Sequence, residues 1–414
     1  MKAKNARRKS TASKKKQKPR SGTGRARSSS RSDKSSGSER PPRPSSKRKT
    51  KPERKRNKNG RGPATQVDFP GSIFDPLEFL ALNNRPSRRR RITPGATHFI
   101  TKKTNDDLFW LVPSEEVNQI LLYTLLLKAE KYGILIHEFV FMSDHFHLMQ
   151  TDPRGETPNF MREFLCESAK ALKVFLGTDR RIWSGERYTS TEILDKDAFD
   201  RKSAYIRLNP LEAGLTECED WPGLTSANFE HGKGIFATRP EVYFHRSNSP
   251  EAVSLELSPP PSVIRSSLVT ELEGSTVSMI SPQLEVENAR RRCRLALSAV
   301  RSSLERIDKL VRSATKWVLE GLRKSKGKLL GAEKACRTSR MKRGSTPFGK
   351  LNPRFATRDL ELRQAAVESF RRFDREHRAA VERLRDGERC VEFPYGTFQY
   401  YRRWPITVRG LAQC

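Results

Sequence analysis

The stretch "ILIHEFVFMSDHFHLMQTD" (residues 134–152) constrains the fold of this chain most strongly. Its first half is rich in β-branched and aromatic residues, which predicts a buried strand. Its second half, His145–Asp152, alternates between two sets of side chains, as strands do. The tight connection at Ser143–Asp144 joins the two halves, either as a hairpin or as a bulged continuation of one strand.

The segments before this pair predict a strand and a helix. Ala96–Thr104 is the strand candidate, and residues 106–113 are its hairpin partner or its continuation. A helix is expected to begin after Ser114, an N-cap residue type followed by two acids, and to stop at Gly133.

The segments after the pair predict two more helices. Residues 157–177 carry an apolar stripe at helical spacing, and residues 197–215 form a helical segment that breaks at Asn209–Pro210. This order of elements predicts an α+β fold, with a ferredoxin-like (RRM-like) antiparallel sheet and helices on one face. A mainly helical C-terminal extension follows.

Shifts in composition divide the chain into four parts. These are a disordered basic tail (1–65), an α+β domain with the histidines (66–231), a Pro/Ser-rich linker (232–283) and a helical region ending in an aromatic and basic strand (284–414). In the last part, apolar residues from Leu297 to Val318 step by three and four. Such a seam favours either a coiled coil or packing against the domain.

The tail holds much of the chain's net charge of +33. Residues 1–65 contain 25 Lys or Arg and only three acids, Asp33, Glu39 and Glu53, with very few apolar side chains. Such a segment cannot bury enough apolar surface to offset the entropy lost on ordering the backbone. We expect a tail that attaches to nucleic acid electrostatically, or one that only aids solubility.

Targeting and redox signals are lacking in the sequence. No apolar segment follows the basic start of the chain, and no apolar stretch is long enough for a membrane span. The six cysteines are scattered without a CxxC pair. We therefore expect a cytoplasmic, nucleoid-associated protein with no membrane partner.

His145 and His147 are the first candidates for chemistry. Residues i and i+2 of a strand point to the same face, so one metal ion could be bound by both imidazoles. Taken alone, this spacing is a weak signal, because packed or surface histidines show it as well.

Four segments resemble, in order and spacing, the REP-associated tyrosine transposases of the HUH family of single-tyrosine transposases. They are "MSDHFH" with the strand before it, "RIWSGERY", "YIRLNPLEAGL" and "DWPGLTSANF", and they lie within residues 90–230. Ser143 and Asp144 stand where the family has Pro and Asn. The later matches are Trp183, Arg187, Tyr188, Tyr205, Ile206, Asn209, Pro210, Ala213, Gly214, Leu215, Trp221 and Ser226.

This resemblance implies a transposase that acts on DNA. His145 and His147 would hold Mg²⁺ or Mn²⁺, which polarises the scissile phosphate of single-stranded DNA. A tyrosine on the following helix would attack the phosphorus and form a 5′-phosphotyrosine link, and a nearby Asn or Gln would complete the metal shell. The implied function is single-strand nicking and joining in DNA transposition and recombination. The implied partners are single-stranded or hairpin DNA and a second copy of the chain.

The sequence departs from the family at the nucleophile. Residues 157–177 contain no tyrosine, and Ala171 or Leu172 stands where one is usual. Leu176 or Gly177 stands where the metal-binding Asn is usual. Three substitutes are conceivable: Tyr188 from the loop, Ser168 or Cys166 from the helix, or a metal-activated water. The alternatives are a degenerate transposase, a domesticated DNA-binding protein without catalysis, and an RNA-binding protein.

Further side chains are candidates for the same site. His98 lies near the metal or is a hydrogen-bonded sheet histidine, and His137 is expected in the core. Basic residues in the matched region are candidate phosphate contacts, although each could equally be a solvated surface charge. They are Lys102, Lys103, Arg162, Lys170, Lys173, Arg180, Arg181, Arg187 and Arg207.

Overall fold

A computed structural model describes residues 90–217, 219–243, 248–268, 282–295, 297–325, 327–338, 353–388, 390–397 and 407–408. The predicted basic tail, the first part of the domain expected at residues 66–231 and most of the aromatic C-terminal strand lie outside these residues.

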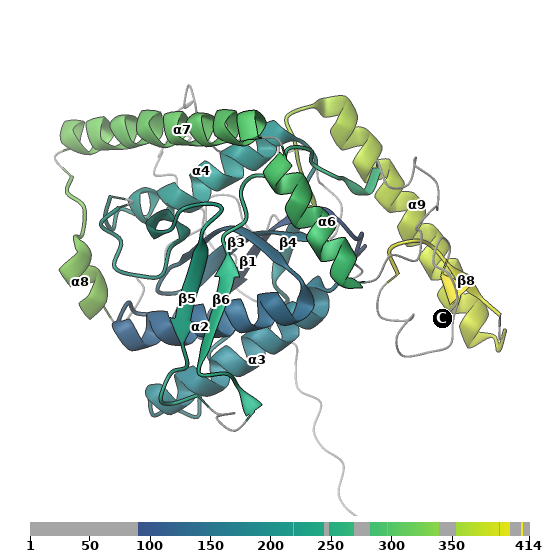
Figure 1. Cartoon of the computed structure of the whole chain (residues 1–414), viewed down its shortest axis with the longest axis horizontal. Helices are drawn as coiled ribbons and strands as arrows, with labels where there is room; N and C mark the ends of the chain where they lie inside the picture. Colours follow the sequence, from purple (N-terminus) through teal and green to yellow (C-terminus); the bar gives the residue numbers. More distant parts are fainter. Residues whose placement is uncertain are drawn as a thin grey trace, which may run out of the picture. The chain divides into compact units, whose positions relative to one another are not determined.

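The centre of the fold is a five-stranded sheet with the order β2-β3-β1-β4-β7. Strands β3, β1 and β4 of this sheet are labelled in Figure 1. Neighbouring strands are antiparallel, except that β7 runs parallel to β4. The strands are β1 (Ala96–Lys103), β2 (Leu135–Phe141), β3 (His145–Asp152), β4 (Thr189–Ile193) and β7 (Phe355–Ala356). The two strands predicted from residues 134–152 are confirmed, and they pair with a register shift between Ile136 and Glu138.

Helices cover both faces of this sheet. On one face, α2 (Glu115–Tyr132) and α3 (Thr157–Phe175) share a hydrophobic cluster with Ile100 and Phe146. On the other, α4 (Lys196–Glu212) and α7 (Leu297–Lys324) share a cluster with Phe99. We call these the α2/α3 face and the α4/α7 face.

The α+β class is therefore confirmed, but the expectation that helices cover one face is wrong. The physical reason is that the strands are apolar on both sides. Leu148 of β3 enters the cluster of the α2/α3 face, whereas its neighbour Met149 enters that of the α4/α7 face. A sheet with two apolar faces must cover both.

Local signals set the ends of two helices. The Ser114 side chain accepts a hydrogen bond from Val117 N (3.2 Å), and Gly133 ends α2 with φ of 66°. At α4, Asp195 accepts a hydrogen bond from Ala198 N (2.7 Å). The predicted break at Asn209–Pro210 is wrong, because α4 continues through Pro210 to Glu212. Pro210 has no N–H to donate to the carbonyl oxygen four residues back, so the helix continues past it with this one hydrogen bond missing.

Two other expectations are corrected. The strand expected at residues 106–113 is instead the short 3-10 helix Asn105–Asp107 followed by irregular chain. The segment predicted as a linker contains β5 (Gly234–Thr238) and β6 (Ala252–Glu256), which pair antiparallel and lie against α2. Their buried residues alternate along each strand, but surrounding Ser and Pro residues obscured that period.

The C-terminal region is mainly helical where it is described. It contains α6 (Pro282–Leu295), α7, α8 (Ala332–Arg337) and α9 (Leu360–Arg385), and a short parallel pair of β8 (Glu392–Phe393) with β9 (Thr407–Val408). The apolar seam of α7 packs against α4, and Ile307 within it is fully buried. Packing against the domain is thus the alternative that the structure supports. None of the helices in the described ranges has the length and apolar character that a membrane span requires.

Candidate metal and nucleic-acid site

His145 and His147 lie side by side on β3. Their ring centroids are 4.8 Å apart and their planes are inclined by 76°. Both point to the α4/α7 face, because His147 pairs in register with Thr101 and stacks on Phe99, which belongs to that face. His147 is 5% exposed, whereas His145 is partly open to solvent.

Each imidazole has a partner that fixes its orientation. Asp144 Oδ1 lies 2.7 Å from His145 Nδ1, and Thr101 Oγ1 lies 2.8 Å from His147 Nδ1. If each Nδ1–H donates to its partner, each Nε2 is left with a lone pair. Metal-binding histidines in proteins are held in this way by a carboxylate or another acceptor behind the ring.

The protonation state of this pair suits cation binding. Burial lowers the pKa of His147 well below its usual value, and the neighbouring His145 and Lys202 add to the effect. Burial acts to raise the pKa of Asp144, but the hydrogen bond and charge of His145, together with a backbone hydrogen bond and the charge of Lys103, outweigh it, and the net direction is down. His147 is thus a neutral imidazole beside an ionised carboxylate, the forms that metal coordination requires.

Helix α4 contributes a tyrosine to the same face. The Tyr205 hydroxyl lies 3.5 Å from His147 Nε2, and the two rings meet at 63° with centroids 5.2 Å apart. Tyr205 also meets Phe99 edge to face at 5.9 Å. Lys202, one turn earlier, brings Nζ within 5.4 Å of the Phe99 ring centroid. The histidine pair therefore has an aromatic wall and a cation at its edge.

One turn after Tyr205, Asn209 adds a carboxamide. Its side chain hydrogen-bonds to Tyr205, and its Oδ1 is buried without a hydrogen-bond donor in the described part of the chain. A buried carbonyl oxygen without a donor is uncommon and requires an explanation. Oxygen and imidazole together form a donor set that Mg²⁺ or Mn²⁺ can accept. Among the residues described, no cluster of three or more His, Cys, Asp or Glu side chains could hold a metal, so a third protein ligand would have to be of another type.

The structure does not bring Tyr188 to the histidines. The guanidinium carbon of Arg90 lies 3.6 Å from the Tyr188 ring centroid, and the ring packs on the cluster of the α2/α3 face. Tyr188 precedes Thr189, which pairs with Thr101 on the α4/α7 face, so alternation along the strand turns Tyr188 the other way. Burial raises the pKa of Tyr188.

The other suggested nucleophiles also lie away from the pair. Ser168 Oγ is fully buried, donates to Phe164 O (2.7 Å) and accepts from Trp183 Nε1 (3.2 Å). Cys166 is exposed on α3. The positions where the family's tyrosine would fall, Ala171 and Leu172, are buried in the α2/α3 cluster.

Two further histidines are structural. His98 points to the face opposite the pair, with Nδ1 3.2 Å from Ser190 Oγ, so it is a hydrogen-bonded sheet histidine. His137 lies in the core, as expected. Its Nδ1 donates to the carbonyl oxygens of Ser258 (3.1 Å) and Pro259 (3.0 Å), and its Nε2 accepts from Thr151 Oγ1 (2.8 Å).

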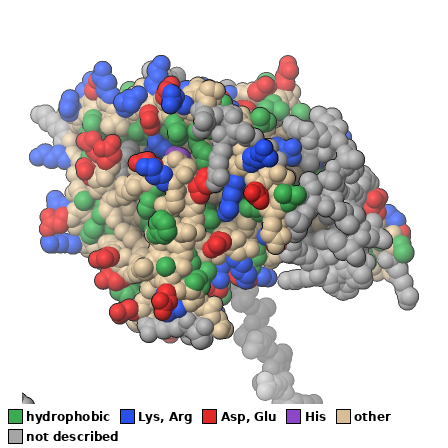
Figure 2. Space-filling model, viewed as in Figure 1, with side chains coloured by type: hydrophobic (Ala, Val, Ile, Leu, Met, Phe, Trp, Pro, Cys, Tyr) green, Lys and Arg blue, Asp and Glu red, His purple; other side chains and the backbone are tan. Residues whose placement is uncertain are grey.

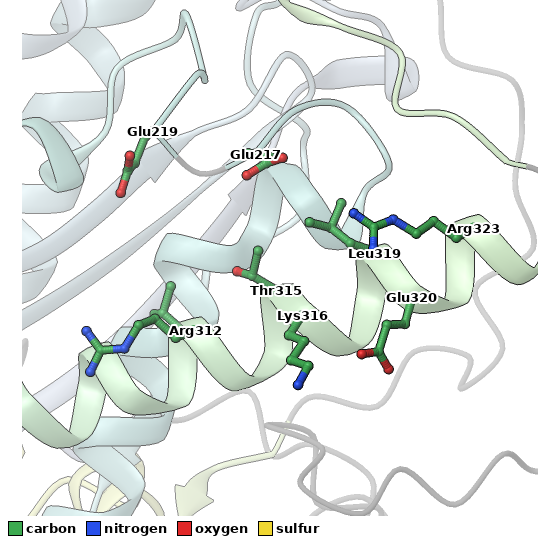
Figure 3. Close-up of a pocket in the computed structure, with 9 residues that line it drawn as sticks. Glu217, Glu219, Arg312, Thr315, Lys316, Leu319, Glu320 and Arg323 are labelled. Carbon is green, nitrogen blue, oxygen red and sulfur yellow. The ribbon is translucent and has the colours of Figure 1, made fainter.

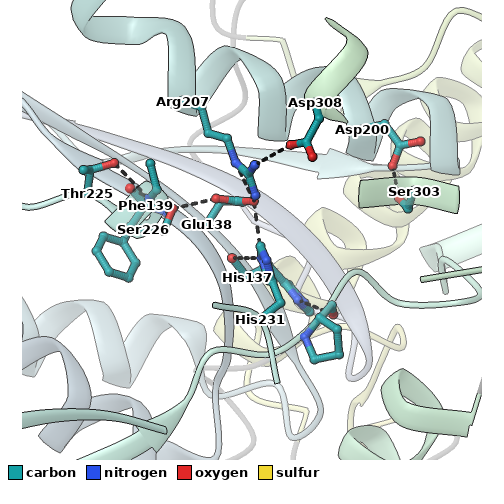
Figure 4. A network of polar contacts seen from close by, with 12 residues as sticks. His137, Glu138, Phe139, Asp200, Arg207, Thr225, Ser226, His231, Ser303 and Asp308 are labelled. Carbon is teal, nitrogen blue, oxygen red and sulfur yellow. Dashed lines mark hydrogen bonds and ion pairs between the residues drawn. The ribbon is translucent and has the colours of Figure 1, made fainter. Parts of the chain in front are cut away.

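Two of the candidate phosphate contacts are already engaged within the fold. Lys102 is 4% exposed and donates to Ser184 O (2.9 Å) and to Glu186 O, and burial lowers its pKa to about 8. Arg207 pairs with the buried Glu138 (2.7 Å) and with Asp308 of α7 (3.1 Å) (Figure 4). Most of the others are exposed, namely Lys103, Arg162, Lys170, Arg180, Arg181 and Arg187; Lys173 is half-buried.

The surface carries a groove that none of the histidines lines. This groove, of about 450 Å³, lies between α7 and the pair Glu217 and Glu219. It is lined by acids such as Glu217 and Glu320 and by bases such as Arg312 and Lys316 (Figure 3). On the face in Figure 2, Lys and Arg are likewise interleaved with Asp and Glu. Mixed charge of this kind gives little net attraction for phosphate. The groove is therefore a weaker candidate than the histidine cluster.

Comparison with known proteins finds matches among solved structures. No family model and no curated protein match the chain. Among solved structures, it is similar to a REP-associated tyrosine transposase bound to a REP hairpin, with 20% sequence identity over 35% of this chain and 84% of the other. The TM-score is 0.30, so the likeness carries no weight beside the geometry described above.

Sequence reasoning did not assign Tyr205 or Asn209 to the site, although both belong to a matched segment. Their i, i+4 spacing puts them on one face of a helix. Which face meets the histidines was not visible in the sequence.

Proposed function

We propose that this chain binds single-stranded or hairpin DNA and cleaves and rejoins it as a transposase of the HUH type, with Mg²⁺ or Mn²⁺ held by His145 and His147. The observation that carries the proposal is the oriented histidine pair. Both rings face one side of the sheet, each has a partner at Nδ1, and His147 is neutral.

The metal would supply charge for the phosphate in the transition state. The chain's own groups would bind and position the DNA. Lys202 lies at the edge of the aromatic wall, where a cation can meet a phosphate, and exposed bases such as Lys103 and Arg187 can contact the backbone. The element order and the strand order β2-β3-β1-β4 support a ferredoxin-like arrangement of the domain.

The proposal is tested with the full-length protein, end-labelled single-stranded hairpin DNA and Mn²⁺. We expect cleavage products with the natural protein and none with His145→Ala or His147→Ala. Binding of Mn²⁺, followed by electron paramagnetic resonance, should weaken in both variants. His98→Gln, on the opposite face of the sheet, is the matched control and should keep both properties. Wild-type protein that neither binds Mn²⁺ nor cleaves any strand would refute the proposal.

A second candidate is a domesticated, non-catalytic DNA-binding protein. The observation that favours it is α3, where Ala171 and Leu172 are buried and chemically inert. In that case the protein would retain DNA binding in the same assay, without cleavage at any metal concentration.

A further inference from the structure

Three arginines from different segments lie along β4. Arg187 comes two residues before the strand. The guanidinium carbon of Arg90 lies 3.6 Å from the Tyr188 ring centroid, and Arg90 also donates to the carbonyl oxygen of Tyr188. Arg354, from the C-terminal region, accepts a hydrogen bond at its carbonyl oxygen from Glu192 N (2.7 Å). We call Arg187, Arg90 and Arg354 the arginine row.

The charges of the arginine row act on one another. Burial lowers the pKa of Arg90, Tyr188 partly offsets this, and the charge of Arg187 lowers the pKa further. Burial likewise lowers the pKa of Arg354, Asp374 partly offsets this, and the charge of Arg90 lowers the pKa further. Like charges held together where water is partly excluded repel one another strongly. An anion bound along the row would relieve this repulsion.

Aromatic rings hold two of these guanidinium groups in position. Arg90 lies over Tyr188, and the guanidinium carbon of Arg354 lies 4.0 Å from the ring centroid of Phe370 on α9. A guanidinium placed on a ring is already oriented, so less side-chain entropy is lost when its N–H groups bind a phosphate in pairs. All three side chains can be reached by a ligand, because Arg187 is exposed and the other two are half-buried.

The arginine row suits the backbone of a duplex better than a single strand. Proteins that bind single strands stack the bases on open aromatic rings. Here Tyr188 lies between Arg90 and the cluster of the α2/α3 face, and Phe370 is buried, so neither ring is open to a base. The strand positions next to Arg90 and Arg354 are four residues apart, which is roughly 13 Å along a strand. That length matches about four base-pair steps along one strand of a duplex.

We propose that the arginine row binds the phosphates of one strand of duplex DNA, beside the single-stranded segment on which the histidines act. The inference rests on the proposed function for the choice of DNA as the anion. The row begins at the histidine end of the sheet, because Thr189 of β4 pairs with Thr101 of β1, and Lys103 of β1 pairs with His145. Arg354 lies outside the segments that resemble the transposases, so the C-terminal region takes part in holding the DNA.

The first test measures binding of the full-length protein to a short blunt duplex without unpaired bases, over a range of salt concentrations. Each phosphate contact on a duplex changes the slope of log affinity against log salt by about 0.9. The double variant Arg90→Gln/Arg354→Gln should therefore have a slope shallower by about 1.8, and an affinity about 30-fold weaker at about 0.15 M salt. Arg312→Gln/Lys316→Gln, in the groove of mixed charge, is the matched control. Its slope should change by less than about 0.9.

The second test uses the natural protein alone, so it does not depend on the folding of a variant. Phenylglyoxal modifies accessible arginines, and peptide mass spectrometry reports the extent of modification at each one. Bound duplex should slow the modification of Arg187 and Arg354 and leave that of Arg312 unchanged. A single strand of the same length should protect the row less than the duplex does.

Each failure has its own meaning. An unchanged slope in the double variant, with Arg354 unprotected by the duplex, would overturn the inference. Equal protection by the single strand would also overturn it, because the row would then be a track for single strands. The proposed function is judged separately through His147→Ala, which should lose Mn²⁺-dependent cleavage and still bind the duplex through the row. Natural protein that binds the duplex at the row but cleaves no DNA would refute the proposed function and leave the row in place.

Discussion

At the scale of single residues, the fold uses its histidines in two ways. His147 and His145 each have a close partner at Nδ1, whereas the Tyr205 hydroxyl lies 3.5 Å from His147 Nε2, at the long limit of a hydrogen bond. His137 has both ring nitrogens engaged by Ser258, Pro259 and Thr151, which suits a core residue. The contact at Nε2 separates the two roles better than burial does. His147 and His137 are both buried, but the hydroxyl nearest Nε2 lies at 2.8 Å in His137 and at 3.5 Å in His147.

The buried histidines should make stability depend on pH. Burial lowers the pKa of His98 and of His137 to about 4, from about 6.5 in an unfolded chain. Between these values the unfolded state binds more protons, so this contribution to the free energy of unfolding is present above pH 6.5 and is lost as the pH falls toward 4. From pH 6.5 to pH 5, each histidine should account for a loss of roughly 1.5 kcal/mol.

Urea unfolding at the two pH values measures this loss. Carboxylates also change protonation in this pH range. The histidine contribution is therefore isolated by comparing the natural protein with His137→Gln and, separately, with His98→Gln. Each variant should lose less stability than the natural protein over this interval, whatever its stability at pH 6.5. If a variant loses as much free energy of unfolding between pH 6.5 and pH 5 as the natural protein, the replaced histidine does not change its pKa on folding.

At the scale of elements, a polar network ties β2, α4 and α7 together (Figure 4). Glu138 is fully buried on β2, pairs with Arg207 and accepts a hydrogen bond from Ser226 Oγ (2.6 Å). Burial alone would raise the pKa of Glu138, but the charges of Arg207 and His231 hold it well below its usual range. Since Arg207 also pairs with Asp308, the network fixes α4, and with it Tyr205, between the sheet and α7.

Arg207→Met tests whether Arg207 is a structural or a DNA-binding residue. The change leaves the buried Glu138 carboxylate without its main partner, so the free energy of unfolding should fall by about 3–5 kcal/mol. Affinity for DNA, measured on the folded fraction, should stay within about twofold. Arg162→Met is the control, because Arg162 is exposed and its pair with Glu163 is 3.8 Å long. It should cost less than about 1 kcal/mol. If Arg207→Met loses DNA affinity but not stability, Arg207 is a phosphate contact, as the sequence suggested.

The elements also show what could be predicted from the sequence. The period of His145–Asp152 and the caps at Ser114 and Gly133 are local signals, and each led to the observed element. The partnership of Tyr205 with His147 joins residues 58 positions apart and depends on how α4 crosses the sheet. The spacing of residues within one element does not predict how a helix crosses a sheet. The sequence therefore showed the histidines and the residues of α4 without showing that they meet.

At the scale of the whole molecule, charge and chemistry occupy different parts of the chain. The histidine cluster lies in the described domain, whereas 25 Lys or Arg fall within residues 1–65. On the face of the described region in Figure 2, acids and bases are mixed. We therefore expect the tail to supply general attraction for DNA and the cluster to supply the reaction.

A variant with the Lys and Arg of residues 1–65 replaced by Gln separates these contributions. Each phosphate contact on a single strand changes the slope of log affinity against log salt by about 0.7. The neutral-tail variant should therefore bind single-stranded DNA more weakly at low salt and with a slope shallower by several units, while the position of cleavage stays the same. Because only encounter is affected, the variant should reach the natural rate of cleavage at saturating DNA. An unchanged slope would assign the phosphate contacts to the folded domain, with Lys103 and Arg187 as the first residues to replace.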